Sequence, residues 1–236
     1  MGDAQIWIEW GRGPLFKTCL AFMILGLARR AIMTLWDMAV IGYRAGDKVL
    51  PWRQVVIATL KWMFLVEQLR NRMTFGLTTL AFHVSIIVLP VFLAGHIALW
   101  ERGIGLSWPA IPNSAADVLT AVAVLSALLL MLQRLVARDS RALSRAQDYA
   151  IPLIVAAPFV TGFFVMHPAW NPFSYETALL AHVYSADLLI LLIPVSKLSH
   201  MVLLPSTQLV SELAWHFPPD AGSKVAVALG KENEPI

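Results

Sequence analysis

Five long apolar runs constrain the fold of this chain more than any other feature of its sequence. They cover residues 14–28, 75–100, 116–135, 150–166 and 178–204. An α-helix needs about 20 apolar residues to cross a hydrocarbon layer about 30 Å thick, where every backbone polar group must find a partner within the protein. The runs therefore predict an all-α integral membrane protein with five transmembrane helices. The first run reaches full length only if it begins near Ile6.

Composition supports this class and excludes several others. Apolar residues make up 58% of the 236 residues and charged residues 14%, which is too apolar for an ordinary soluble domain. The single cysteine, Cys19, excludes an internal disulfide, an iron–sulfur cluster held by this chain alone and covalent c-type haem. Asp3 and Glu9 make the start of the chain unlike a cleavable signal peptide. We therefore expect the first span to anchor the chain.

The distribution of Lys and Arg predicts the orientation in the membrane. The connection between the first and second spans is rich in both, and the connection between the third and fourth spans holds Arg138, Arg141 and Arg145. The second-to-third connection has only Arg102, and the fourth-to-fifth has no Lys or Arg. Because cytoplasmic loops carry the excess of positive charge, the N-terminus is expected outside and the C-terminus inside. Basic charge sorted in this way forms no nucleic-acid-binding face, so no nucleic acid partner is expected.

The same pattern predicts one transmembrane domain over residues 1–204, with a cytoplasmic collar at 29–72 and a cytoplasmic C-terminal tail at 205–236. A break at 45–51 separates two collar helices, 31–43 and 52–66, which we expect to lie at the membrane surface or to extend a span. Pro218, Pro219 and Gly222 predict an extended tail from Ser206 onward. Such a tail fits either a docking strip for a soluble partner or a simple chain end.

Four of the six histidines lie inside two of the apolar runs, His83 and His96 in the second and His182 and His200 in the fifth. A buried imidazole in hydrocarbon is a candidate functional group, although a single one can also hydrogen-bond across helices or line a proton path. Because the two spans are antiparallel, depth pairs His83 with His200 near the inner face and His96 with His182 near the outer face. A haem iron takes two axial ligands, so two imidazole pairs indicate two haem groups.

Helix geometry supports the spacing of His182 and His200 better than that of His83 and His96. His182 and His200 are 200 − 182 = 18 residues apart, a whole number of turns on an ideal helix, which predicts that they share one face. His83 and His96 are 96 − 83 = 13 residues apart and do not share a face on an ideal helix. Pro90 lies between them, and proline removes a backbone hydrogen bond and kinks a helix. We therefore expect the second span to depart from ideal geometry.

The fifth run also resembles a known family. Residues 193–200, Ile-Pro-Val-Ser-Lys-Leu-Ser-His, resemble the end of the last span in the cytochrome b subunit, or gamma chain, of respiratory nitrate reductase, where a Pro-x-Ser-Lys/Arg-x-x-His pattern carries a haem ligand. The 18-residue histidine spacing and the Gly95-His96 pair are also similar, and the resemblance covers roughly residues 14–204.

Three departures make the chain more similar to a wider superfamily. The second-span histidines are farther apart here by about one turn, the collar is longer, and the lysine that helps bind quinol in the nitrate reductase subunit has no clear counterpart. That superfamily includes the membrane cytochromes that accompany heterodisulfide-reductase-like iron–sulfur proteins, as in sulfite-reductase-linked complexes. Nitrate is therefore not the expected substrate of the complex.

The resemblance implies a dihaem cytochrome b with a four-helix core, in the cytoplasmic membrane of a bacterium or archaeon. Its cofactors are two haem b groups, with iron held by His83/His200 and by His96/His182, and its substrate is menaquinol or ubiquinol. Quinol is oxidised near the outer haem, and electrons pass inward to a cytoplasmic iron–sulfur partner subunit; the reverse flow reduces quinone. The chain would then be the electron-transfer subunit of an oxidoreductase complex.

Residues near the outer face are candidates for the quinone site. A carboxylate there can accept a quinol proton and aromatic rings can hold the head group, although Trp and Tyr also form the ordinary interfacial belt. Basic residues near the inner face suit either lipid phosphates or haem propionates. The outer candidates are Trp100, Glu101 and Arg102, followed by Trp108, Tyr175 and Glu176, and the inner ones are Arg134, Arg138 and Arg141.

Two other classes of protein stay open. A small transporter subunit would use buried polar groups along a path, but the spans hold few carboxylates besides Asp117 and Asp187, and no inverted repeat is visible. A haem-free anchor would not need four histidines at matched depths. The remaining two histidines, His167 and His216, fall in an outer loop and in the tail, where solvated or capping roles are expected.

Overall fold

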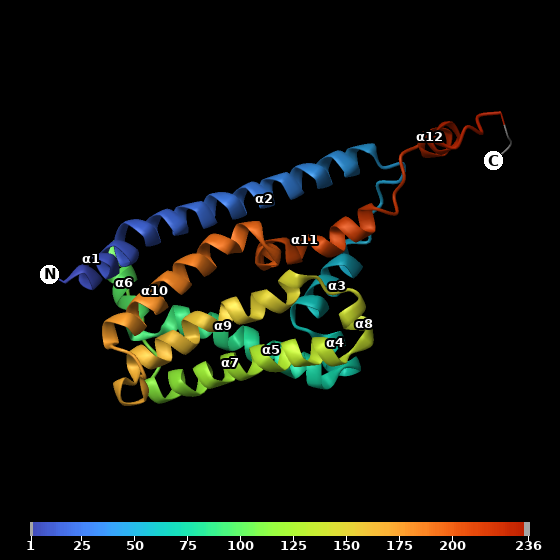
Figure 1. The fold of residues 1–236 in the computed structure, drawn as a ribbon. Coiled ribbons are helices and arrows are strands. Elements are labelled where there is room, and N and C mark those ends of the chain that lie inside the picture. Colours follow the sequence, from blue (N-terminus) through green and yellow to red (C-terminus); the bar gives the residue numbers. More distant parts are fainter. Residues whose placement is uncertain (1, 234–236) are drawn as a thin grey trace. The chain divides into compact units, whose positions relative to one another are not determined.

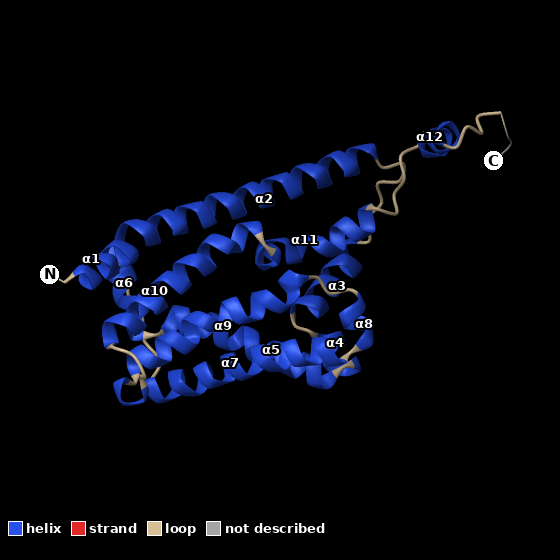
Figure 2. Ribbon diagram, in the orientation of Figure 1, coloured by secondary structure: helices blue, strands red, loops and turns tan. Residues whose placement is uncertain are grey.

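The computed structural model describes residues 2–233, without the side chains at 67, 204, 205 and 208, and this part of the chain forms helices and loops but no strand (Figure 2). Five helical segments are long and apolar enough to cross a membrane: Asp3–Arg44, Met73–Phe92, Asn113–Val136, Ala146–Met166 and Tyr175–Val195. The prediction of an all-α, multi-pass membrane protein with five spans is confirmed at this level.

The elements form a single series of helices along the chain (Figure 1). In order they are α1 (Asp3–Trp10), η1 (Gly11–Leu15), α2 (Phe16–Arg44), α3 (Trp52–Met63), α4 (Val66–Asn71), α5 (Met73–Phe92), α6 (Ala94–Ile104), α7 (Asn113–Val136), α8 (Arg138–Ala142), α9 (Ala146–Met166), η2 (Pro168–Trp170), α10 (Tyr175–Leu192), η3 (Ile193–Val195), η4 (Lys197–Ser199), α11 (His200–Leu213) and α12 (Ala221–Ala228).

The chain packs as two compact units, the first comprising Met1–Ala21 and Glu67–Leu191 and the second Phe22–Val66 and Leu192–Ile236. In the first unit α7 packs against both α5 and α9 (Figure 1). Small residues on α7, among them Ala123 and Ala127, are fully buried in these contacts, and small side chains let membrane helices approach closely. Val118 and Leu125 of the same helix are exposed to 63% and 59%, as expected of a lipid-facing side.

In the second unit α3 packs against α11, and Val55 and Leu213 are buried. The loop after α2 is tied to the chain after α11, because the Gly46 N–H donates to the carbonyl of Phe217 at 2.8 Å. The predicted break at 45–51 is confirmed, since α2 ends at Arg44 and α3 begins at Trp52. The first collar helix is thus the continuation of the first span.

Three sequence-based boundaries need correction. The second collar helix, expected over 52–66, ends at Met63, and the chain turns at Leu65, which has φ 54°. The expected fifth span, 178–204, is interrupted after Leu192 by two short 3-10 turns, so α11 is a separate helix. The tail is not extended from Ser206, because α11 continues to Leu213 and α12 follows. The last three residues of the predicted tail lie outside the described residues.

The interruption of the fifth span has a clear local cause. Pro194 has no N–H to continue the helix, and Ser196 has an extended backbone with φ −118° and ψ −174°. The carbonyl of Pro194 accepts a hydrogen bond from Nε of Arg30 on α2, which satisfies a group that the break leaves without a helical donor. Gly26, also on α2, lies directly against the Pro194 ring.

Replacement of Gly26 by alanine tests this contact. A Cβ atom at Gly26 would lie 2.5 Å from Cβ of Pro194, so α2 or the break must shift. We expect Gly26→Ala to lower the free energy of unfolding in detergent by about 1–3 kcal/mol, the usual cost of overpacking. Circular dichroism during titration with a denaturing detergent measures the change. The matched control is Gly13→Ala, because a Cβ there meets nothing within 4 Å; equal unfolding of both variants would contradict the contact.

Candidate functional site

A break in the second span positions the first histidine of the site. Helix α5 ends at Phe92, two residues after Pro90, and Leu93 is extended with φ −76° and ψ 131°. Two donors from the following loop satisfy carbonyls at this helix end: Nε1 of Trp108 bonds the carbonyl of Val91 at 2.8 Å, and the Ile111 N–H bonds the carbonyl of Phe92 at 3.0 Å. The expected departure from ideal geometry is confirmed, and His96 falls in the first turn of α6.

The second histidine of the site, His182, lies on α10 against α9. Its Nδ1 donates a hydrogen bond to the carbonyl of Pro158 at 2.8 Å. A Cβ atom at Gly162, one turn further along α9, would lie 3.0 Å from both Cε1 and Nδ1 of the ring. Gly162 therefore leaves the space that the imidazole occupies. The hydrogen bond fixes the tautomer in which Nε2 carries the free lone pair.

His96 and His182 face each other as a parallel pair. Their ring centroids are 6.0 Å apart and the ring planes differ by 2°. No hydrogen bond joins the two rings within residues 2–233. Nδ1 of His96 is buried without a hydrogen-bond partner among the described residues.

This pair fits the axial positions of a haem iron. A metal–nitrogen bond of about 2 Å on each side sets the two nitrogens about 4 Å apart, which is compatible with ring centroids at 6.0 Å. A metal ion held by side chains alone needs three or four ligands, and no cluster of three or more His, Cys, Asp or Glu residues that could hold one occurs in the described chain. A haem iron needs only two, because the porphyrin nitrogens fill the other positions.

The other two candidate ligands belong to different units. His83 lies on α5 and its Nδ1 donates to the carbonyl of Thr79 at 2.8 Å. His200 is the first residue of α11 and its Nδ1 donates to the carbonyl of Lys197 at 2.9 Å. The prediction that His182 and His200 share one face of a continuous helix is wrong, because the chain leaves the helix between Leu192 and His200.

Most of the candidate quinone residues lie on α6 or beside it. Trp100, Glu101 and Arg102 lie on this helix, one to two turns after His96, and Glu101 and Arg102 are exposed. The ring centroids of Trp100 and Trp108 are 6.5 Å apart. Tyr175 and Glu176 begin α10 and are also exposed.

The predicted inner arginines have local partners. Arg134 donates to the Ser144 hydroxyl at 3.0 Å, and Arg141 donates to the carbonyl of Leu135 at 3.2 Å. Both bonds stabilise the connection between α7 and α9. Arg138, the first residue of α8, is exposed.

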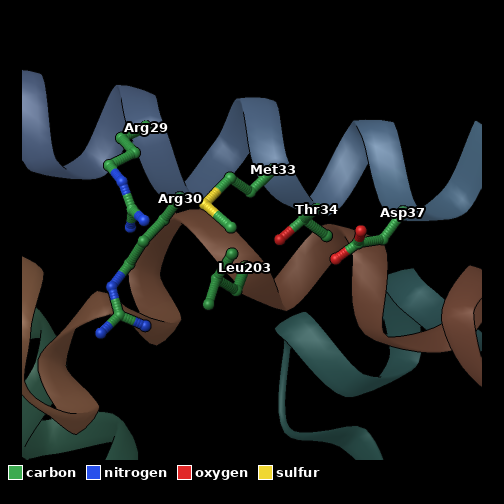
Figure 3. A pocket seen from close by; sticks show the side chains of 6 residues that line it. All are labelled: Arg29, Arg30, Met33, Thr34, Asp37 and Leu203. Atoms are coloured by element: carbon green, nitrogen blue, oxygen red, sulfur yellow. The ribbon is translucent and has the colours of Figure 1, made fainter.

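A basic pocket of about 280 Å³ lies in the second unit, a feature that the sequence did not predict. Its guanidinium groups extend from α2 toward α11 (Figure 3). Arg29 and Arg30 suit a carboxylate or phosphate, because a guanidinium binds these groups with two parallel hydrogen bonds. The lining residues are Arg29, Arg30, Met33, Thr34 and Asp37 of α2 and Leu203 of α11.

Two polar features of the first unit also escaped prediction from sequence. His167 and Asp117, whose Nε2 and Oδ1 atoms are 2.8 Å apart, link the end of α9 to the start of α7. Asp187 of α10 is 3% exposed, and its Oδ2 has no hydrogen-bond partner among the described residues. The sequence showed both carboxylates within apolar runs, but a separation of 50 residues gives no sign that Asp117 meets His167.

Comparison with known proteins gives one relative and no description of function. The chain is 32% identical over 198 residues to a protein of Nitratidesulfovibrio vulgaris strain Hildenborough, an alignment that covers 81% of this chain and 85% of the relative. The chain belongs to the same family as this protein. The relative is named "Protein", which assigns no function to the family. No family model matches the sequence, and no solved structure is similar to it.

Gly162→Val tests the fit of the imidazole pair. Even the first added carbon would lie 3.0 Å from the His182 ring, so the valine must displace the imidazole from its position opposite His96. If the pair holds a haem, this displacement should lower the ratio of bound haem to polypeptide in the purified variant. Absorbance of the pyridine haemochrome per polypeptide measures this ratio. Gly103→Val is the control, because a Cβ there meets nothing within 4 Å; equal haem loss in both variants would contradict the fit.

Proposed function

We propose that this chain is the dihaem cytochrome b subunit of a membrane oxidoreductase complex, moving electrons between a quinol pool and an iron–sulfur partner subunit. The observation that carries the proposal is the parallel His96/His182 pair, with ring centroids 6.0 Å apart in a chain of five candidate spans. Bound haem would supply reversible one-electron chemistry at each iron. The residues of the chain hold, orient and shield it.

Backbone carbonyls orient the proposed ligands. Nδ1 of His83, His182 and His200 each donates to a carbonyl, at 2.8 to 2.9 Å. Metal-ligating histidines almost always donate their second ring N–H to a carbonyl, carboxylate or water, which fixes the tautomer and raises ligand basicity. The same hydrogen-bond pattern at three of the four histidines supports their common role.

The second haem is assigned to His83 and His200. The basic pocket supports a role for the His200 end, because Leu203 follows His200 by three residues and so lies one turn along α11. The guanidinium of Arg29 in this pocket can bind an anionic group such as a haem propionate. Asp37 lowers the net positive charge of the same pocket.

The arrangement in the membrane follows from the charge pattern. The basic connections favour a cytoplasmic side for the C-terminus and the α2–α3 region, and an outer side for the N-terminus. Quinol then binds at the outer end near His96, where Trp100, Glu101 and Arg102 lie on α6. The iron–sulfur partner docks on the cytoplasmic side of a bacterial or archaeal membrane.

Four single substitutions test the assignment of ligands. Leucine has no iron ligand, so we expect His96→Leu and His182→Leu each to lower the haem content from about two to about one per chain by removing the same haem. His83→Leu and His200→Leu should remove the other haem. Reduced-minus-oxidised visible spectra at low temperature, with the haem-to-polypeptide ratio, distinguish the two groups. His216→Leu is the control, since its Nδ1 lies 3.8 Å from Asp47 in the loop region.

The presence of haem in the purified protein distinguishes the proposal from its alternatives. A haem-free membrane anchor or a small transporter subunit gives a well-folded preparation without haem, and that result would overturn the proposed function. Loss of both haems in every histidine variant would instead reject the pairing of ligands. Reduction of the bound haem by a quinol analogue would support the quinol-linked role.

A further inference from the structure

A histidine–carboxylate pair stands at the same end of the first unit as the His96/His182 pair. Nε2 of His167 donates to Oδ1 of Asp117 at 2.8 Å, and the side chains are 30% and 41% exposed. The His167 ring lies against Phe163, with centroids 4.3 Å apart and planes at 36°. The ring is therefore held by one hydrogen bond and one aromatic contact, while part of its surface is exposed.

This hydrogen bond determines which nitrogen can accept a proton. Because Asp117 accepts the Nε2 proton, Nδ1 of the neutral ring carries the free lone pair. Nδ1 has no hydrogen-bond partner within residues 2–233. A carboxylate that orients one imidazole nitrogen and stabilises the imidazolium form is the usual support for a histidine general base.

Two structural links connect the helices of the His167/Asp117 pair with those of the imidazole pair. Along α9, His167 follows Gly162 by five residues, so it lies about 7–8 Å along the helix axis from the residue that contacts the His182 ring. From the other side, the Ile111 N–H bonds the carbonyl of Phe92. This bond brings the start of α7, which carries Asp117, to the helix break that precedes His96. Helices α6, α7 and α9 thus converge at one end of the unit.

We propose that His167, oriented by Asp117, is the proton acceptor for quinol oxidised at the outer end of the chain. The inference rests on the proposed function and names the residue that accepts the protons released by quinol. For each quinol, two O–H bonds break, and each proton passes in turn to Nδ1 of His167 and from there to water. Two bound haem groups, held by His96/His182 and by His83/His200, would take up the two electrons, one at each iron, which leaves quinone as the product.

Other charged groups of the first unit lie on α6 and α10. Asp117 on α7 is the acidic partner of His167, and η2, which follows His167 in the chain, has no titratable residue. Glu101 and Arg102 on α6 and Glu176 on α10 are exposed.

His167→Gln tests the inference in the purified full chain. Glutamine can still donate a hydrogen bond to Asp117 but cannot take up a proton. We expect unchanged haem content and an unchanged dithionite-reduced spectrum, but a 10- to 100-fold slower reduction of haem by menadiol in stopped-flow absorbance, in the lower part of the range for general-base catalysis. In the unaltered protein the rate should rise with pH, because only the neutral imidazole can accept a proton, and the variant should lose that rise.

Two further measurements exclude a merely structural role. Asp117→Asn should keep the haem and the fold but change the pH profile, because the carboxylate no longer orients the ring. Equilibrium binding of a fluorescent quinolone inhibitor, which needs no electron transfer, should weaken several-fold in His167→Gln. His216→Gln is the matched control, because that histidine lies in the second unit, and it should match the unaltered protein in rate, pH profile and binding.

The outcomes separate the inference from the proposed function. Full haem content, an unaltered menadiol rate and an unaltered pH profile in His167→Gln would overturn the inference and leave the cytochrome intact. An unaltered chain that purifies without haem would overturn both. A slower rate with no change in its pH dependence would show that His167 positions the site without accepting the proton, and would also reject the proposal.

Discussion

The need to satisfy every backbone polar group in hydrocarbon governs this structure. A helix that ends inside the membrane exposes carbonyls without donors, and each one is costly there. Two of the spans nevertheless end near prolines, at Phe92 and at Leu192. The break after α5 is stabilised by Trp108 and Ile111, and the break after α10 by Arg30. These bonds make the interruptions stable features of the fold.

The interruptions matter because they determine where the candidate ligands lie. The break at Leu93 turns the chain before His96, so the imidazole meets His182 without any requirement for a shared helical face with His83. The same break holds the loop before α7 close to the end of α5, because the Ile111 N–H donates to the carbonyl of Phe92. The second break separates His182 from His200 and gives α11 a packing surface of its own against α3.

Proline and glycine act together at both places. Pro158 and Gly162 on α9 supply, respectively, a carbonyl for His182 and the space for its ring. Gly26 on α2 supplies the space for Pro194. In both cases a small residue on one helix faces a bulky or rigid group on the other, which is how membrane helices approach closely without a hydrophobic driving force between them.

The sequence alone determined the class of protein and the number of spans, because apolar length reports directly on the thickness of hydrocarbon that a helix can cross. It also marked the four membrane histidines and the disturbance at Pro90, since composition and proline chemistry are local properties. The tertiary structure decided that His96 and His182 are parallel, that the fifth span is broken before His200, and that Asp117 meets His167. These features join residues far apart in the chain, and only packing and hydrogen bonding between helices fix such contacts.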